Sequence, residues 1–350
     1  MKRSSGNILA SLLLLFAIAV TGCSRASAAA SETSADPEKR TLDSLKEEAS
    51  GIYVMDYYAD YKLDEFLASN ITDVMSFDKW MTENLTHGVP TGDFPDFGCS
   101  SFAVKGTDGD HLFGRNYDMK PGDSLVIRTD PENGYASIGV VDLMHINIGS
   151  DGNYSMDDEN ARTLLLAAPL CICDGINEKG LGASLLELSV KHTVTDKSKD
   201  DLLLYCAVRV VLDKCANIDE ATALLSGFDM YSSRSSTSYH VFLTDTSGRS
   251  VIVEWNEDGD MVIVEDTAVT NFPLYPGDTT KDYDRRYAKI HRRIDGVDSL
   301  SSEGAMTVLE AACQDSTHWS AVYDLEKFTA EIAFNLDYGK TYSFSGRMDP

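Results

Sequence analysis

The stretch from Phe97 to Asp118 constrains this chain more than any other part of the sequence. It reads FGCSSFAVKGTDGDHLFGRNYD, with a short alternating apolar run on either side of Asp108-Gly109, a dipeptide that favours a tight hairpin turn. A turn centred on this dipeptide would place Cys99 opposite Asp118 and bring Arg115 close to both. A purely structural hairpin rarely gathers a thiol, a guanidinium and a carboxylate at one end, so the sequence predicts a functional site here.

The composition indicates a globular protein with an acidic surface. The chain has 350 residues, of which 43% are hydrophobic and 25% charged, and its formal net charge is −26. Nucleic-acid binding depends mainly on contacts from Lys and Arg to phosphates, so this charge argues against a nucleic-acid partner. The sequence leaves a homo-oligomer open.

The first residues predict export and membrane anchoring. Lys2 and Arg3 precede an apolar run at 8–20 that is too short to be read as a membrane span. The run ends in Val20-Thr21-Gly22-Cys23, which resembles the bacterial lipoprotein box and makes Cys23 the lipid-bearing residue. The alternative is an ordinary signal peptide cut near 28–30. We therefore expect an extracytoplasmic bacterial lipoprotein whose partner through Cys23 is the lipid membrane.

The pattern of apolar residues divides the chain into four regions. They are a signal peptide at 1–22, a flexible Ser/Ala-rich tether at 23–41, a helical N-terminal segment or propeptide at 42–98, and a catalytic domain at 99–350. Predicted strands cover 99–105, 111–116, 135–143, 163–173, 181–188, 239–245, 250–256, 261–270, 318–324, 328–335 and 340–345, and predicted helices cover 199–214, 217–225, 284–294 and 302–313. Strands in runs with helices in pairs favour two stacked sheets covered by helices over an alternating α/β fold.

The remaining cysteines give little support to a metal site. Cys171 and Cys173 have a spacing that invites one, but no second Cys or His pair at ligand spacing accompanies them. We interpret them as small buried residues on a strand. No metal or organic cofactor is expected.

A cysteine nucleophile needs a base or a positive neighbour to reach its thiolate form. His240 is the best histidine partner for a papain-like arrangement. Papain-type cysteines lie at a helix N-terminus, however, whereas Cys99 opens a predicted strand that has no helix dipole. We therefore prefer to interpret His240 as an ordinary strand residue.

The other source of a base is the chain itself. Cleavage between Gly98 and Cys99 would make the α-amine of Cys99 the base, as in N-terminal nucleophiles. A free α-amine titrates at about 7.7–8.0 and a free thiol at about 8.5, which is close enough for proton exchange near neutral pH. Arg115 would then hold the thiolate, and Asp118 would orient the amine.

Five segments follow one another in the order of the motifs of a known family. They are Cys99 to Asp118, Asp174 to Leu181 (DGINEKGL), Val269 to Pro273 (VTNFP), Asp284 to Tyr287 (DRRY) and Trp319 to Asp324 (WSAVYD). Over about residues 95–350 the sequence resembles the choloylglycine hydrolase / linear amide C–N hydrolase family. Its members are N-terminal-nucleophile hydrolases, so the resemblance implies an α+β fold of the four-layer αββα sandwich type.

The resemblance also implies roles for individual residues. It makes Cys99 the nucleophile, Arg115 its contact and Asp118 the partner of the amine. It implies Asn271 as an oxyanion-hole donor and one of Arg285 and Arg286 as a catalytic arginine, with a surface helix charge as the alternative for either.

One position departs from part of the family. Where bile salt hydrolases carry an oxyanion-binding Asn, this chain has Glu187, as in the N-acylethanolamine acid amidase and acid ceramidase branch. A carboxylate facing an oxyanion would repel it, so we expect Glu187 to be protonated or hydrogen-bonded elsewhere, with a solvated strand residue as the alternative.

The sequence therefore predicts a cysteine amidohydrolase that cleaves a non-peptide linear amide through a thioester on an N-terminal Cys99. The substrate would be a small N-acyl amide, a conjugated bile acid or a penicillin V type compound. Three alternatives stay open: an acyltransferase that uses the same acyl-enzyme, a papain-like cysteine peptidase, and a non-catalytic binding lipoprotein.

Overall fold

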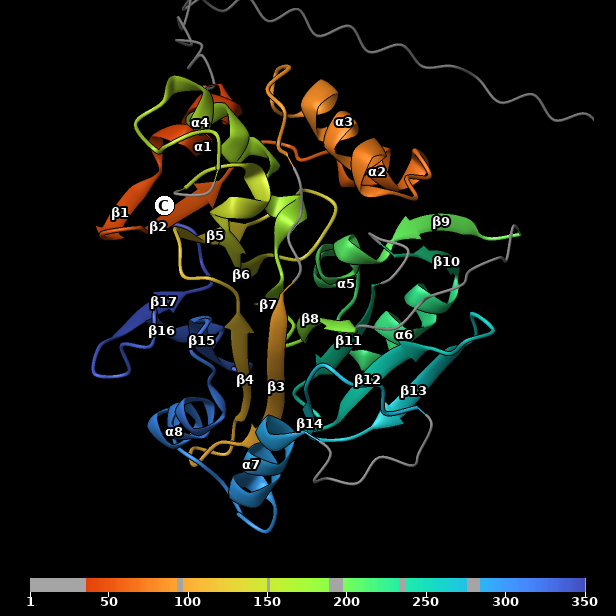
Figure 1. Ribbon diagram of the computed structural model, residues 1–350, viewed down its shortest axis with the longest axis vertical. Helices are drawn as coiled ribbons and strands as arrows, with labels where there is room; N and C mark the ends of the chain where they lie inside the picture. The colour runs from red at the N-terminus through yellow and green to blue at the C-terminus, as the bar shows by residue number, and fades with distance from the viewer. Residues whose placement is uncertain are drawn as a thin grey trace, which may run out of the picture. The chain divides into compact units, whose positions relative to one another are not determined.

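Two β-sheets lie face to face in the computed structural model, which describes residues 36–92, 97–149, 152–188, 198–232, 237–275 and 284–349. The larger sheet has nine strands in the order β1-β2-β5-β6-β7-β8-β11-β12-β13, and the smaller has six in the order β14-β3-β4-β15-β16-β17. Figure 1 shows β3 and β4 side by side in the middle of the molecule.

The strands follow the apolar runs of the sequence. They are β1 (Lys46–Ala49), β2 (Ile52–Tyr57), β3 (Gly98–Lys105), β4 (His111–Asp118), β5 (Ser124–Thr129), β6 (Ser137–Asp142), β7 (Asp174–Asn177), β8 (Gly182–Leu188), β9 (Asp200–Leu203), β10 (Phe228–Tyr231), β11 (Ser238–Thr244), β12 (Ser250–Trp255), β13 (Met261–Glu265), β14 (Ala268–Val269), β15 (Thr317–Asp324), β16 (Thr329–Phe334) and β17 (Thr341–Ser345). Strands β9 and β10 form a separate parallel pair.

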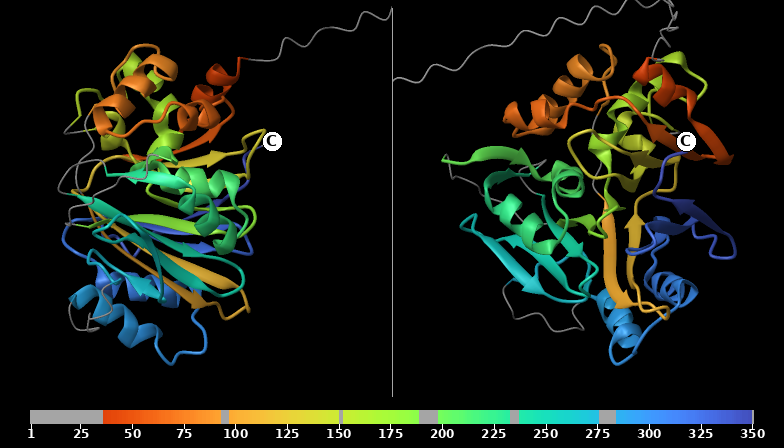
Figure 2. Two further views of the ribbon diagram at one scale, coloured as in Figure 1. Left: turned by 90° about the vertical axis from the view of Figure 1, so that its right-hand side faces the viewer. Right: turned by 180° about the vertical axis from the view of Figure 1, so that it is seen from behind.

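Helices cover the outer faces of the sheets. They are α1 (Pro37–Asp43), α2 (Leu63–Ala68), α3 (Val74–Asn84), α4 (Glu159–Leu164), α5 (Ala207–Lys214), α6 (Ile218–Ser226), α7 (Arg285–Ile294) and α8 (Ser302–Ala312). Helices α5 and α6 pack on the nine-stranded sheet, and α7 and α8 pack on the six-stranded sheet. Figure 2 shows α7 and α8 (blue) on one outer side of the stacked sheets. The expected four-layer αββα sandwich is confirmed.

The prediction of a helical N-terminal segment at 42–98 is partly wrong. Helices α2 and α3 are present, but β2 enters the nine-stranded sheet beside β5, and its residues are almost all buried. The partner strand β5 (Ser124–Thr129) was not predicted either, and the two stabilise each other by parallel pairing from Ile52↔Ser124 to Tyr57↔Thr129. Such a pairing depends on residues far apart in sequence, which local periodicity cannot reveal.

The predicted tether at 23–41 ends earlier than expected. Pro37 lies in the first turn of α1, where its missing N–H costs nothing, and the Asp36 side chain caps that turn by accepting a hydrogen bond from Glu38 N. The buried Thr41 ties this helix to the next segment, because its Oγ1 accepts hydrogen bonds from the backbone N–H groups of Tyr58 and Ala59.

The prediction of a strand at 163–173 is wrong. This stretch forms the end of α4 and a 3-10 helix (Leu165–Cys171) in which every side chain is buried. A short apolar run that is buried on all sides gives the same sequence pattern in a helix as in a strand. Cys171 and Cys173 are both buried and free, as expected for small apolar residues, but neither lies on a strand.

One predicted helix starts later than expected. The segment at 199–214 begins as β9 and becomes α-helical only at Ala207.

Cys23 and the expected signal peptide lie outside the described residues. Within the described ranges, no helix has the length and apolar character that a membrane crossing requires.

Candidate active site

The β3–β4 hairpin forms as predicted, but its register differs by one residue. Its loop closes with a hydrogen bond from Gly106 N to Asp110 O at 2.7 Å, and Gly109 takes a φ of +89° that favours glycine. The observed loop shifts the pairing of the two strands by one residue relative to the expected two-residue turn. Cys99 therefore pairs with Tyr117, and Gly98 pairs with Asp118.

This shift changes which side chains share a face of the sheet. Paired residues point to the same face of an antiparallel sheet, and successive residues alternate between faces. Cys99 and Arg115 therefore share the face that looks toward the nine-stranded sheet, whereas Asp118 lies on the opposite face. The site is built on both sides of the start of β3, not on one.

On the inner face, Arg115 and the Cys99 thiol meet at the same backbone carbonyl group, that of Leu185. The Leu185 carbonyl oxygen accepts a hydrogen bond from Arg115 Nη2 at 2.8 Å and lies 3.7 Å from Cys99 Sγ. Both side chains are fully buried. Arg115 Nη1 has no hydrogen-bond partner among the described residues, so this donor is available to a thiolate.

Asp174 balances the charge of Arg115, a role that the sequence analysis missed. Its Oδ2 accepts hydrogen bonds from Arg115 Nε at 3.2 Å and from Trp319 Nε1 at 3.2 Å, and its Oδ1 accepts one from Tyr323 at 2.5 Å. Burial raises the pKa of Asp174, while Arg115 and these donors act in the opposite direction. The segments at 174–181 and 319–324 were expected from the motifs, but the contact between them depends on the stacking of the two sheets.

On the outer face, Arg286 connects the remaining predicted residues. Its Nη1 donates to the Cys99 carbonyl oxygen and to Asp118 Oδ2, both at 2.9 Å, and its Nη2 donates to Asn271 Oδ1 at 3.0 Å. The start of α7 fixes this position, because the Asp284 side chain caps the helix by accepting from the Arg286 N–H at 2.8 Å. Arg285 is exposed on the same helix, so the structure brings Arg286 and not Arg285 to the site.

Asn271 holds the backbone nitrogen of Cys99. Its Oδ1 accepts a hydrogen bond from Cys99 N at 2.7 Å, and its Nδ2 donates to the Glu187 carbonyl oxygen at 2.7 Å. An amide nitrogen carries two hydrogens, so one donor of Asn271 is left for an oxyanion. Asp118 accepts hydrogen bonds from Arg286, Gln314 and Thr317, so it is linked to Cys99 through Arg286.

Glu187 binds the segment that precedes Cys99. Its Oε2 accepts a hydrogen bond from Phe97 N at 2.8 Å. The carboxylate therefore has a hydrogen-bond donor in the backbone before Cys99, as in the expectation that it is hydrogen-bonded to a group other than an oxyanion.

Burial raises the pKa of Cys99 to about 12, although Arg115 acts in the opposite direction. The thiol of the uncut chain is therefore protonated at neutral pH. A new base close to the sulfur would change this state, and an α-amine released by cleavage at Gly98–Cys99 would be such a base.

His240 belongs to a different cluster. Its Nδ1 lies 2.8 Å from Glu254 Oε1, and the Glu254 carboxylate also accepts hydrogen bonds from the backbone N–H groups of Leu274 and Tyr275. No hydrogen bond between described residues links His240 to Cys99. The pair instead anchors the backbone that follows Asn271.

Comparison with known proteins identifies the family of the chain. The family described as linear amide C-N hydrolases, choloylglycine hydrolase family, matches residues 99–293, which is more than half of the chain. The chain therefore belongs to this family, and it is a hydrolase that acts on non-peptide carbon–nitrogen bonds in linear amides.

Solved structures with the same fold are distant in sequence. A mutant of the conjugated bile acid hydrolase from Clostridium perfringens superimposes with a TM-score of 0.54 at 17% identity, covering 71% of this chain and 92% of that one. A second variant of that enzyme gives a TM-score of 0.50 at 16% identity with the same coverage. Penicillin V acylase from Agrobacterium tumefaciens gives 0.47 at 18% identity, covering 67% and 83%.

Removal of the Asn271 side chain is expected to slow catalysis strongly. Asn271→Ala removes the side chain that the sequence predicts as an oxyanion donor, together with the acceptor for Cys99 N, and loss of one oxyanion donor lowers kcat by about 10²–10³-fold. The measurement is kcat on the protein's best amide substrate, with the exposed Asn133→Ala as the matched control. An Asn271→Ala enzyme with the kcat of the control would contradict this role.

The buried histidine beside the site predicts a loss of stability in acid. Burial lowers the pKa of His145 to about 4, from about 6.5 in an unfolded chain. The unfolded state binds more protons between these values, so this group removes roughly 3 kcal/mol of stability as pH falls from 7 to 4. Urea unfolding at several pH values should show a smaller acid loss in His145→Gln than in the parent. Equal losses in the two proteins would contradict it.

Proposed function

We propose that this chain cuts itself between Gly98 and Cys99 and then hydrolyses a linear amide with the new N-terminal cysteine. The observation that carries the proposal is the way in which Cys99 is held. Its thiol lies beside the buried Arg115, and its backbone nitrogen and carbonyl oxygen bind Asn271 and Arg286. A cysteine with a purely structural place in a strand would not require these side-chain contacts.

Self-cleavage begins with the Cys99 thiol. The sulfur adds to the Gly98 carbonyl carbon, the C–N bond to Cys99 breaks, and the thiol proton passes to the released nitrogen. Water then hydrolyses the thioester, which leaves a carboxylate on Gly98 and restores the thiol. A Cβ at position 98 would lie 3.2 Å from the Asp118 Cβ and 3.3 Å from Gln314 Nε2, so glycine fits this crowded position best.

Amide hydrolysis repeats the same steps on a substrate. The α-amine of Cys99 takes the thiol proton, the sulfur attacks the substrate carbonyl, and Arg115 stabilises the thiolate. Asn271 stabilises the oxyanion, and the ammonium of Cys99 gives its proton to the leaving amine. Water, activated by the same amine, hydrolyses the thioester and releases the acid.

The two fragments are expected to stay together after cleavage. Strand β2 lies within the nine-stranded sheet, the Tyr61 hydroxyl donates to the buried Asp213 at 2.5 Å, and Arg128 pairs with Asp56 at 2.5 Å. Gel filtration without denaturant should therefore elute the segment ending at Gly98 together with the one beginning at Cys99. Separation of the two under these conditions would contradict the prediction.

The N-terminal segment supports a proposal for the localisation of the enzyme. We propose that Cys23 carries the lipid and that the retained N-terminal fragment holds the enzyme at the membrane. The support is the short apolar run before Cys23 and the position of β2 in the sheet. Cys23→Ser should release the enzyme into the soluble fraction, and unchanged membrane association would contradict the anchor.

A substrate panel tests the proposed function. Purified protein would be assayed with bile salts, penicillin V, N-acylethanolamines and N-acyl amino acids, together with a Cys99→Ala control. Hydrolysis of at least one amide, lost in the control, supports the proposal. No difference between the two proteins on any member of the panel would contradict it.

A further inference from the structure

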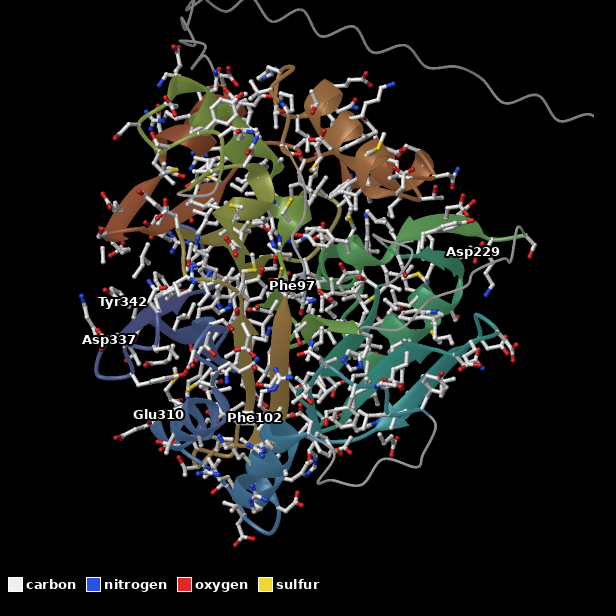
Figure 3. The ribbon with its side chains drawn as sticks, viewed as in Figure 1. Phe97, Phe102, Asp229, Glu310, Asp337 and Tyr342 are labelled. Carbon is white, nitrogen blue, oxygen red and sulfur yellow. The ribbon has the colours of Figure 1, made fainter. Side chains whose placement is uncertain are left out.

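The side chain of Phe97 fills an aromatic cavity next to the nucleophile. Phe97 lies two positions before Cys99 and is only 4% exposed. Its ring centroid lies 5.2 Å from that of Tyr117, 5.8 Å from that of His145 and 5.9 Å from that of Tyr239. Figure 3 labels Phe97 at the start of β3, in the middle of the molecule.

Self-cleavage makes this segment the first acyl group that the nucleophile carries. In the thioester, the carbonyl of Gly98 is bonded to the Cys99 sulfur, and the chain runs back from it to Phe97. A substrate presents its own carbonyl to the same sulfur, so its acyl group leaves the carbonyl on the same side. Once the segment ending at Gly98 moves out, the cavity that held the ring is open to that acyl group.

The residues that wall the cavity are held in place by contacts with residues other than Phe97. Tyr117 stacks on Trp319 with ring centroids 3.9 Å apart and planes 9° apart, and its hydroxyl lies 2.9 Å from His145 Nε2. The His145 Nδ1 also contacts the Tyr205 hydroxyl. Because burial lowers the pKa of His145, the imidazole is neutral at pH 7 and the wall is uncharged. The departure of Phe97 therefore leaves a formed apolar cavity with a hydrogen-bond acceptor, Glu187, at its edge.

We propose that the cavity vacated by Phe97, walled by Tyr117, His145 and Tyr239, is the acyl subsite of the cleaved enzyme. It takes an apolar acyl group with a ring about five atoms from the scissile carbonyl, the separation that Phe97 has from the Gly98 carbonyl. Glu187 accepts a hydrogen bond from an N–H or O–H of that group, as it does from Phe97 N. This inference rests on the proposed self-cleavage and amide hydrolysis.

Matched fluorogenic amides test the subsite. The cleaved enzyme would be assayed with the aminomethylcoumarin amides of acetyl-Phe-Gly, acetyl-Ala-Gly and 3-phenylpropanoyl-Gly, which lacks the N–H that meets Glu187. Burial of a phenyl ring should raise kcat/KM for the first over the second by about tenfold or more. Loss of a hydrogen bond to the Glu187 carboxylate should lower kcat/KM for the 3-phenylpropanoyl-Gly amide by about tenfold relative to the acetyl-Phe-Gly amide.

Variants of the cavity wall test whether the preference for a phenyl ring comes from this subsite. Tyr239→Ala should reduce the preference for Phe over Ala to within about threefold, and Tyr239→Phe should keep it because the ring is retained. The control Tyr342→Ala, on β17 and away from the cavity, should leave the preference unchanged. Mass spectrometry checks that each variant is still cut before Cys99.

The outcomes distinguish this inference from the proposed function. Equal kcat/KM for the Phe and Ala amides, or no hydrolysis of the Phe amide by an enzyme that hydrolyses another amide of the substrate panel, overturns the subsite and leaves the proposed function standing. Absence of hydrolysis of any amide by the cleaved protein overturns both.

Discussion

Replacement of Cys99 by alanine is expected to leave a single uncut chain without measurable amide hydrolysis. In the proposed mechanism the sulfur is the attacking atom in both self-cleavage and catalysis, and removal of a nucleophile lowers kcat by at least about 10⁴-fold. The fold should survive, because the change removes one buried sulfur and leaves the backbone contacts to Asn271 and Arg286 in place.

The measurement combines a gel with an amidase assay on the same preparations. The matched control is Cys313→Ala, which removes another free cysteine that lies outside the site and should be cut and active like the parent. Full activity in Cys99→Ala would contradict the account. Loss of activity in both variants would show that the effect is not specific to Cys99.

Replacement of Arg115 by methionine is expected to abolish activity and to destabilise the fold. Arg115 and Asp174 form an ion pair in which both side chains are fully buried. Removal of one partner of such a pair leaves a buried charge unpaired and costs about 3–5 kcal/mol. The Cys99 thiolate would also lose its positive neighbour.

A double variant separates these two effects. Arg115→Met combined with Asp174→Asn removes both charges, so the free energy of unfolding should recover most of the loss, while kcat should stay near that of the single variant. Urea unfolding and the amidase assay measure the two quantities. A double variant with parental kcat would show that Arg115 serves stability alone.

The sequence predicted which layers make up the fold, but it did not predict every strand of the nine-stranded sheet. The hairpin, the capped helix α6 and the C-terminal β15–β16 hairpin have local signals, and all three form close to where they were expected. Strand β2 has only a short apolar run, from Ile52 to Met55, and its place is set by its pairing with β5. That an N-terminal segment enters the nine-stranded sheet could not be inferred from that pattern.

The site shows the same division between local and long-range information. Cys99, Arg115 and Asn271 lie in recognisable motifs, and the structure brings them together. The distinction between Arg285 and Arg286 depends on the direction in which a helix face points, which the motif does not reveal. The Asp174 contact depends on the packing of two sheets, and the one-residue shift of the hairpin depends on the geometry of its loop.

The mass of the purified full-length protein under denaturing conditions tests the central claim most directly. We predict two fragments, the larger of which begins at Cys99 and carries a free α-amine, and a single uncut chain for Cys99→Ala. An uncut parent chain with full amidase activity would contradict the claim that Cys99 acts as an N-terminal nucleophile.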